Sequence, residues 1–292
     1  MMFSCGCCGA DTAEALLVAP DSLGQPVTIA HCTICCALTP IYQSSKKTHV
    51  DQQCEWGDAP WSKESEEELK NHAQTMKGLL SFYRKYLPSQ GQKLKVYDIG
   101  AGRGNLIASL IEEGYDASAC EPSVILSSRA RNIYGLTENQ LVTASADDFL
   151  DAKVAEAGSV KTVFLWHVLE HMTEPVKLLK RIREILSEDG SIICQGPLLH
   201  PAYVYPEHFF LHTESNISWL AEAAGLKLLM EECQAPERFS SFVMAHPNHP
   251  EPACPQVRLN DSLLAVGSLY FTLSQSLARL SARLAANPPL ST

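Results

Sequence analysis

The chain has 292 residues and a formal net charge of −10, and 46% of its residues are hydrophobic. This length and composition fit a globular protein of one large or two modest domains. The acidic balance disfavours nucleic-acid partners, which usually meet a basic face. No apolar run approaches the roughly 20 residues that cross a bilayer, and residues 1–5 lack the pattern of a secretory signal. We therefore expect a cytoplasmic protein that acts on small molecules, with no nucleic-acid or membrane partner.

The first fifth of the chain is rich in cysteine and holds seven of the eleven cysteines. Cys5 and Cys8 form one Cys-x-x-Cys unit, and Cys32 and Cys35 form a second unit, with 23 residues between the two. In a cytoplasmic protein such pairs favour metal binding over disulfides, and four thiolates complete a tetrahedral zinc site. We predict a zinc-ribbon-like domain over residues 1–55.

The alternatives to a zinc site here are a redox dithiol and inert buried thiols. A redox Cys-x-x-Cys unit normally opens a helix, whereas residues 15–19 and 27–31 have the pattern of two short strands around a turn. The ligand set stays open, because Cys7, Cys36 and His31 are alternative zinc ligands.

Residues 56–90 predict a bridging helix. Ser62 is expected as its N-cap, acids follow in the early turns, and apolar side chains recur at helical intervals up to Pro88. Such a helix either covers a ligand cleft or packs on the main sheet. The aromatic residues that would form a lid are Trp56, Trp61, Phe82 and Tyr83.

An apolar strand over residues 96–99 runs into three alternating glycines, Gly100, Gly102 and Gly104. These glycines allow a tight turn and a close approach of the backbone to a ligand. The helix that follows, residues 106–113, presents free N–H groups and the positive end of its dipole. The loop therefore predicts a nucleotide site.

The residues around this loop disfavour a dinucleotide. Asn105 stands where the third glycine of a dinucleotide fingerprint belongs. Asp98, at the end of the strand, would repel a pyrophosphate, but it suits a ligand with a nearby cationic amino group. S-adenosylmethionine is such a ligand.

Acidic residues follow the next two predicted strands. Glu121 ends the strand that begins near Asp116, seventeen residues after Gly104, where a carboxylate reaches both hydroxyls of an adenosine ribose. The strand over residues 140–144 leads to acids that can accept the adenine amino group and to an aromatic side chain that can cover its ring. Those residues are Asp147, Asp148 and Phe149.

These elements, with the segment from His167 to His171 after a fourth strand over residues 160–165, resemble a class I S-adenosylmethionine-dependent methyltransferase over residues 94–246. The run at residues 186–193 is similar to that family's turn into its fifth strand. The resemblance implies a doubly wound, Rossmann-like α/β sheet over residues 91–247. It also implies a cofactor site formed by Asp98, Gly100, Ala101, Gly102, Asn105, Glu121, Pro122, Asp147, Asp148, Phe149, Trp166 and His167.

In that family the acid at Glu121 binds ribose, and Gly100 and Gly102 line the methionine moiety. The adenine position is left open, since Ser145, Asp147 or Asp148 each matches it. The cysteine-rich N-terminus is similar to the small zinc-binding domain that precedes the catalytic domain in some sugar methyltransferases.

Five histidines cluster after the fourth and fifth strands of the predicted sheet. Methyl transfer is an in-line displacement in which positioning can be worth ~7–11 kcal/mol, and a histidine base could add roughly 10²–10⁴-fold. We take His200, His167 and His208 as candidate catalytic residues, and Tyr205 and His171 as candidate substrate-binding residues. Each histidine has a purely structural role as its alternative.

The tail, residues 256–292, follows a proline-rich linker and carries apolar residues at alternating steps of three and four. This pattern predicts a C-terminal helix with a heptad seam. The helix either packs on its own catalytic domain or forms a homodimer contact.

The sequence predicts methyl transfer from S-adenosylmethionine to a small polar acceptor, an oxygen or carbon of a sugar or a related intermediate. One alternative is a quinone-like or phenolic hydroxyl. An alternative of another class is a catalytically inactive methyltransferase fold that serves as a zinc-bearing scaffold.

Overall fold

The computed structural model describes residues 2–42, 65–89, 93–234 and 238–254. The predicted C-terminal helix, residues 256–292, lies outside the described residues, as do Trp56, Trp61 and Ser62. Among the helices that are described, none is long and apolar enough to cross a membrane.

The N-terminal region is a four-stranded antiparallel sheet of β1 (Met2–Phe3), β2 (Ala13–Pro20), β3 (Pro26–Cys32) and β4 (Leu38–Ile41), in that order. The two predicted short strands are the cores of β2 and β3. Their turn is closed by the Asp21 carboxylate, which accepts hydrogen bonds from the backbone N–H groups of Leu23 and Gln25 at 2.9 and 2.8 Å. The cysteine pairs lie at the ends of these strands.

Helix α2 (Glu66–Phe82) begins three residues later than the sequence predicts. Ser65, not Ser62, is the N-cap, because Ser65 and Glu68 form a reciprocal capping box. Leu80 and Tyr83, at the end of the helix, are buried against the main sheet, while Phe82 is 60% exposed. The C-terminal part of α2 therefore packs on the sheet.

The main sheet has seven strands in the order β10-β11-β9-β8-β5-β6-β7. They are β5 (Lys95–Ile99), β6 (Ala117–Cys120), β7 (Leu141–Val142), β8 (Val160–Trp166), β9 (Leu186–Pro197), β10 (Lys227–Gln234) and β11 (Phe239–Ala245). Strands β5 to β9 pair in parallel, and β11 is antiparallel to both of its neighbours. The predicted doubly wound α/β fold is confirmed.

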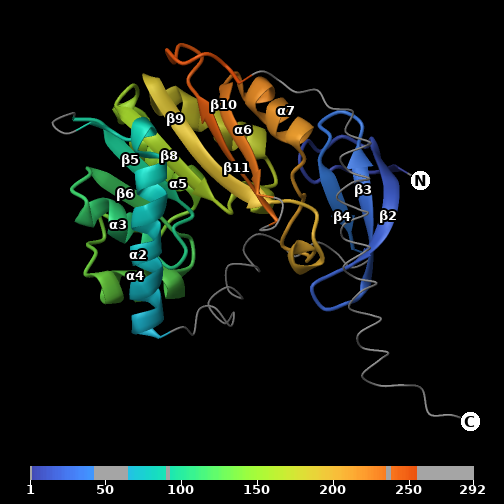
Figure 1. Cartoon of the computed structure of the whole chain (residues 1–292), viewed down its shortest axis with the longest axis horizontal. Coiled ribbons are helices and arrows are strands. Elements are labelled where there is room, and N and C mark those ends of the chain that lie inside the picture. The colour runs from blue at the N-terminus through green and yellow to red at the C-terminus, as the bar shows by residue number, and fades with distance from the viewer. Residues whose placement is uncertain (1, 43–64, 90–92, 235–237, 255–292) are drawn as a thin grey trace, which may run out of the picture.

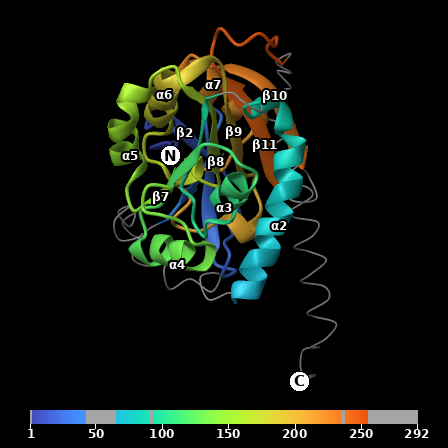
Figure 2. The ribbon, with the colours of Figure 1, turned by 90° about the vertical axis from the view of Figure 1, so that its left-hand side faces the viewer.

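Helices cover both faces of this sheet (Figures 1 and 2). On one face, α2, α3 (Asn105–Glu112) and α4 (Val124–Tyr134) pack on strand residues such as Val96. On the other, α5 (Ala146–Lys153), α6 (Pro175–Ile185) and α7 (Glu214–Ala224) pack on residues such as Tyr97. Neighbouring residues of a strand thus face opposite cores, as a parallel sheet buried on both sides requires.

The segment between β9 and α7 joins the two sheets (Figure 1). Leu38 in β4 and Leu211 exchange backbone hydrogen bonds of 3.1 and 2.7 Å, and the Ser22 N–H donates to the Val204 carbonyl at 2.9 Å. This segment also carries His200, His208 and Tyr205. The N-terminal sheet therefore supports a loop that holds several of the predicted site residues.

Candidate functional site

The glycine loop between β5 and α3 has backbone conformations that favour glycine. Gly100, Gly102 and Gly104 have φ angles of 76°, 53° and 77°, all in the left-handed region. A Cβ on Gly100 would lie 2.7 Å from Val168 Cγ2, and one on Gly104 would lie 2.7 Å from the Ala130 Cβ. A Cβ on Gly102 would meet nothing within 4 Å. The loop is packed at its ends and open in the middle.

Two buried carboxylates flank this loop. Glu121 accepts hydrogen bonds from the backbone N–H groups of Gly102 and Ser123, each at 2.8 Å. Asp98 is 2% exposed, and its Oδ2 has no hydrogen-bond partner among the described residues. Burial, followed by the charge of Glu121, raises the pKa of Asp98 to about 7. A buried carboxylate in this state favours a cationic ligand group.

The acidic residues after β7 lie in the first turn of α5 and interact with neighbouring side chains. Ser145 is the N-cap of this helix, and its hydroxyl donates to the Asp148 carboxylate at 2.6 Å. Asp147 is exposed and forms an ion pair with Arg181. Phe149 is 2% exposed and packs in the core. Of these residues, Ser145 lies nearest the end of β7.

The other predicted cofactor residues lie near neighbouring strand ends. Asn105 begins α3 and accepts a hydrogen bond from the Tyr134 hydroxyl at 2.7 Å. Trp166 ends β8, and its ring lies edge-on to Tyr83, with the centroids 6.4 Å apart. Ala101 follows β5, and Pro122 follows β6 by two residues. Because β5, β6 and β8 are parallel neighbours, their carboxyl ends share one edge of the sheet, where ligands of open α/β folds bind.

A second group of titratable side chains follows β8 and centres on Glu170. Its carboxylate is fully buried, and Oε1 lies 3.1 Å from His167 Nδ1 and 3.9 Å from His208 Nε2. The rings of His171 and His208 meet edge-on, with centroids 4.7 Å apart. Burial alone would raise the pKa of Glu170, but the hydrogen bond from His167 and the three nearby imidazoles lower it to about 2. Glu170 is therefore an ionised carboxylate that is surrounded by three imidazole rings.

Both ring nitrogens of His167 are engaged by neighbouring side chains. Its Nδ1 faces Glu170, and its Nε2 lies 3.0 Å from Gln195 Oε1. The Gln195 amide in turn donates to the Ser241 hydroxyl at 2.9 Å. His167 also has a φ of 56°, a left-handed conformation uncommon for a residue with a side chain. The strained turn and these hydrogen bonds fix the ring at the end of β8.

His208 is held in its neutral form. Its Nδ1–H donates to the Tyr203 carbonyl at 2.8 Å, and the ring centroid lies 4.0 Å from that of Tyr205. Burial, followed by the neighbouring His171, lowers the pKa of His208 to about 3. The lone pair of the ring is therefore on Nε2, the nitrogen nearer Glu170.

His200 lies at the edge of this group. Its Nδ1 accepts a hydrogen bond from the Ala202 backbone N–H at 3.1 Å and so caps a short 3₁₀ helix, Pro201–Tyr203. The structure therefore brings together His167, His171, His208 and Tyr205, and links His200 to them through Tyr203, whose ring lies 6.2 Å from that of His200.

The predicted site residues leave out two members of this group. Glu170 stands between His167 and His171 in the sequence, and this position was a usable signal for a buried charged cluster. Phe239, whose ring lies 4.7 Å from that of His167, comes from β11. No local pattern connects residues so far apart in the sequence.

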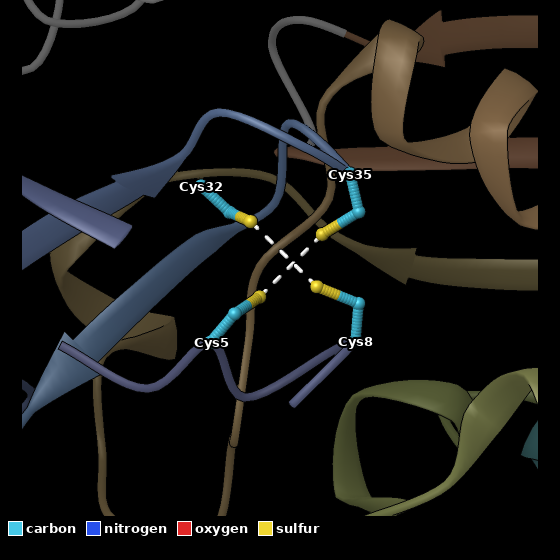
Figure 3. Close-up of side chains that lie close together, drawn as sticks. All are labelled: Cys5, Cys8, Cys32 and Cys35. Atoms are coloured by element: carbon cyan, nitrogen blue, oxygen red, sulfur yellow. Dashed lines mark hydrogen bonds between the residues drawn. The ribbon is translucent and has the colours of Figure 1, made fainter. Parts of the chain in front are cut away.

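The four predicted zinc ligands converge at the end of the N-terminal sheet. Figure 3 shows the thiols of Cys5, Cys8, Cys32 and Cys35 pointing toward one another, and all four sulfurs lie within 4.8 Å of each other. The Sγ atoms of Cys5 and Cys35 are 3.4 Å apart, and those of Cys8 and Cys32 are 3.7 Å apart. A tetrahedral ion with Zn–S bonds of about 2.3 Å requires sulfurs about 3.8 Å apart. The donor set therefore fits zinc.

The two cysteine turns repeat the same backbone pattern. The Cys5 and Cys32 N–H groups donate to the carbonyls five residues later, at 2.9 and 3.0 Å. Gly9 and Cys36 occupy equivalent left-handed positions, with φ of 74° and 60°. Cys36 thus ends a turn. The Cys7 sulfur accepts a hydrogen bond from Asn216 Nδ2 at 3.4 Å. The group of four converging thiols consists of Cys5, Cys8, Cys32 and Cys35 and includes neither Cys7 nor Cys36.

The thiols of the cluster differ in their pKa values. The hydrogen bond with Cys35, together with burial, raises the pKa of Cys5 well above its usual range. Burial acts in the same direction on Cys32, but backbone N–H donors, first that of Cys35, lower its pKa to about 7. Ionisation of all four thiols therefore requires a compensating charge, which a zinc ion would supply.

Comparisons with solved structures find S-adenosylmethionine-dependent methyltransferases among the similar chains. One from Archaeoglobus fulgidus is 16% identical over 59% of this chain and 93% of its own, with a TM-score of 0.45. The 1,6-didemethyltoxoflavin-N1-methyltransferase of Burkholderia thailandensis, with bound 1,6-didemethyltoxoflavin and S-adenosylhomocysteine, is 14% identical over 71% of this chain and 94% of its own, with a TM-score of 0.48. No curated protein matches this chain.

The family profile described as a methyltransferase domain matches residues 71–231, which is more than half of the chain. The matched region contains the glycine loop, both flanking carboxylates and the cluster around Glu170. The chain therefore belongs to the methyltransferase-domain family, and S-adenosylmethionine-dependent methyl transfer is the activity that this membership supports.

Proposed function

We propose that this protein transfers a methyl group from S-adenosylmethionine to an oxygen or carbon of a sugar or a related small polar intermediate. The observation that carries the donor assignment is the buried Asp98 carboxylate, with one oxygen unpartnered among the described residues, beside a glycine loop that is open at Gly102. A cationic ligand that also carries an adenosine satisfies both features.

Different residues in and beside the glycine loop contact different parts of the ligand. Glu121 is held in place by two backbone N–H groups, and each of its oxygens has a second lone pair for a ribose hydroxyl. Asp98 faces the cationic end of the ligand. Gly102 admits the methionine moiety, and the backbone near Ser145 borders the adenine. When bound, S-adenosylmethionine supplies an electrophilic methyl group, and the protein positions an acceptor in line with it.

The acceptor side is the cluster after β8. Glu170, His171 and His208 present a carboxylate and two imidazoles, with Glu170 and His208 buried, His171 half-buried and the Tyr205 ring against His208. We expect these groups to favour a hydroxyl-bearing ligand over an apolar one, because a hydroxyl can satisfy a buried atom such as Glu170 Oε2, which has no partner among the described residues. The polar side chains of this cluster and the similarity of the N-terminus to the zinc domain of some sugar methyltransferases support a sugar-like acceptor.

We further propose that Cys5, Cys8, Cys32 and Cys35 bind one structural zinc ion. The sulfur separations support this assignment, and four protein ligands leave no open position for a substrate. The role of such an ion is to hold the N-terminal sheet, and through it the segment between β9 and α7.

The test of the proposed function is turnover on a panel of acceptors. The purified protein is incubated with S-adenosylmethionine and with nucleotide-linked sugars, free sugars, catechols or quinols, and the S-adenosylhomocysteine formed is measured. We expect turnover with a sugar. Turnover with phenolic acceptors alone would refute the acceptor assignment. Tight cofactor binding with no turnover on the whole panel would favour the inactive scaffold.

A further inference from the structure

Three potential metal ligands meet after β8, far in sequence from the cysteine cluster. Glu170 and His171 belong to a short 3₁₀ helix, Leu169–His171, and His208 comes from the segment before α7. One ligand atom from each residue lies within 4.8 Å of the other two. Two elements of the fold thus converge on one point.

The hydrogen bonds of the two imidazoles fix where their protons are. His171 Nδ1 lies 3.0 Å from the Glu207 carbonyl, and His208 Nδ1 lies 2.8 Å from the Tyr203 carbonyl. A carbonyl can only accept, so Nδ1 carries the proton in each ring. The lone pair of each neutral ring is then on Nε2. A backbone carbonyl that orients an imidazole in this way is the usual support of a metal-binding histidine.

The third group adds a negative charge to these lone pairs. Glu170 is fully buried, and its Oε2 has no hydrogen-bond partner among the described residues. The imidazole nitrogens of His171 and His208 and this carboxylate therefore gather in one place, where Glu170 and His208 are buried and His171 is half-buried. A buried carboxylate oxygen without a partner is costly unless a cation lies beside it.

We propose that Glu170, His171 and His208 bind a divalent transition-metal ion, and that the open coordination position of this ion receives an oxygen of the methyl acceptor. Two imidazoles and one carboxylate favour Zn²⁺, Fe²⁺ or Co²⁺ over Mg²⁺ and Ca²⁺, which prefer all-oxygen ligand sets. Three protein ligands are the number found in catalytic zinc sites, where the remaining position holds water or substrate.

The second part of this proposal rests on the proposed function. A hydroxyl oxygen bound to the ion would lose its proton more easily, because a metal ion lowers the pKa of a coordinated oxygen. The proton leaves to solvent or to a neighbouring base, and the oxygen lone pair then attacks the methyl carbon as the sulfur–carbon bond breaks. The site thus selects acceptors with a hydroxyl group.

Metal titration tests the site without reference to activity. Metal-free full-length protein is titrated with Co²⁺, whose thiolate charge-transfer absorption reports the cysteine cluster, while an imidazole and carboxylate site lacks that absorption. We expect about two ions per chain, one with and one without the thiolate signal. His171→Ala should remove only the second ion, or weaken its binding by more than the roughly 10–100-fold cost of losing an outer-shell partner.

Two further variants separate ligand loss from misfolding. Glu170→Gln keeps the size of the buried side chain and should also lose the second ion. His246→Ala, just after the end of β11, is the matched control and should bind both ions. Circular dichroism and S-adenosylmethionine binding monitor the fold. Uptake of a single ion by the wild-type protein, or a second ion unaffected by His171→Ala and Glu170→Gln, would overturn the metal site.

The two proposals fail in different ways. Methylation of an acceptor by wild-type protein that takes up only the thiolate-bound ion would refute the second metal site and leave the methyltransferase function intact. Uptake of the second ion without turnover on any acceptor would support the site and refute the function. Retained turnover in a His171→Ala variant that has lost the second ion would overturn the assigned role of the ion in holding the acceptor.

Discussion

Affinity for S-adenosylmethionine should rise with pH because of Asp98. The pKa of this carboxyl is about 7 without ligand, raised by burial and then by Glu121. A bound cation would return it toward the ordinary value of about 4. Binding below pH 7 therefore releases a proton, and the protonated fraction of Asp98 lowers the apparent affinity. The α-amino group of the ligand stays charged up to about pH 7.7, so its own titration does not interfere.

The size of the effect follows from linkage. Between pH 5.5 and 7.5 the protonated form of Asp98 changes from the major to the minor form of the unliganded protein. The affinity should therefore rise roughly 25-fold, or about 2 kcal/mol. The raised pKa of Asp98 also affects the stability of the unliganded protein, which should fall as the pH rises. Because its folded pKa lies above the unfolded value, Asp98 contributes stability that is complete below pH ~4 and is lost as the pH rises through 7.

Calorimetry across this pH range, in buffers of different ionisation enthalpy, measures both the affinity and the proton released. Asp98→Asn should bind more weakly at pH 7.5 and should lose most of the pH dependence. Glu121→Gln keeps the titrating group but removes the neighbouring charge that raises the pKa of Asp98, so its pH dependence should persist and move to lower pH. An affinity that is flat or falls from pH 5.5 to 7.5, or a slope that survives in Asp98→Asn, would show that no cation binds beside Asp98.

Glu121→Ala should weaken S-adenosylmethionine binding by about 1.5–3 kcal/mol, the usual cost of losing hydrogen bonds to a charged group, as calorimetry would show. The combined change Cys5→Ser and Cys32→Ser should remove about one zinc per chain in elemental analysis while cofactor binding persists. Zinc-free wild-type protein, prepared without chelator, would contradict the cysteine site. Gly6→Ala should destabilise the protein by at least about 1–3 kcal/mol in thermal unfolding, because its Cβ would lie 1.8 Å from the Phe209 carbonyl oxygen. Gly78→Ala, in open space on α2, should not destabilise it.

The fold followed from the sequence because its signals are local. The glycine loop, the strand-end acids and the alternation of strands and helices each occupy a few consecutive residues, and the strand predicted over residues 160–165 is β8, which ends one residue later at Trp166. The predicted start of α2 is wrong, although the spacing of Ser65 and Glu68 satisfies the capping-box rule. The error comes from choosing Ser62 as the N-cap rather than Ser65, which forms the capping box with Glu68.

The candidate site followed less well because its geometry is not local. Five histidines are equivalent in the sequence, and only the folded chain separates His200, which caps a turn, from His208, which lies against the Glu170 group. The direction of the Phe149 side chain could not be predicted from the sequence either. Its position after β7 suits an adenine contact, yet its place on α5 turns it into the core.

Direct contacts connect the N-terminal sheet with the cluster around Glu170. Gly6, inside the first cysteine turn, lies directly against the backbone of Phe209, and the Phe209 N–H donates to the Glu170 carbonyl at 2.8 Å. Asn216 at the start of α7 also donates to the Cys35 carbonyl at 3.0 Å. We therefore expect a change in the cysteine turns to displace the loop that carries His208. A zinc ion bound by the cysteines would act on methyl transfer through this contact, by fixing the backbone on which the acceptor-side residues stand.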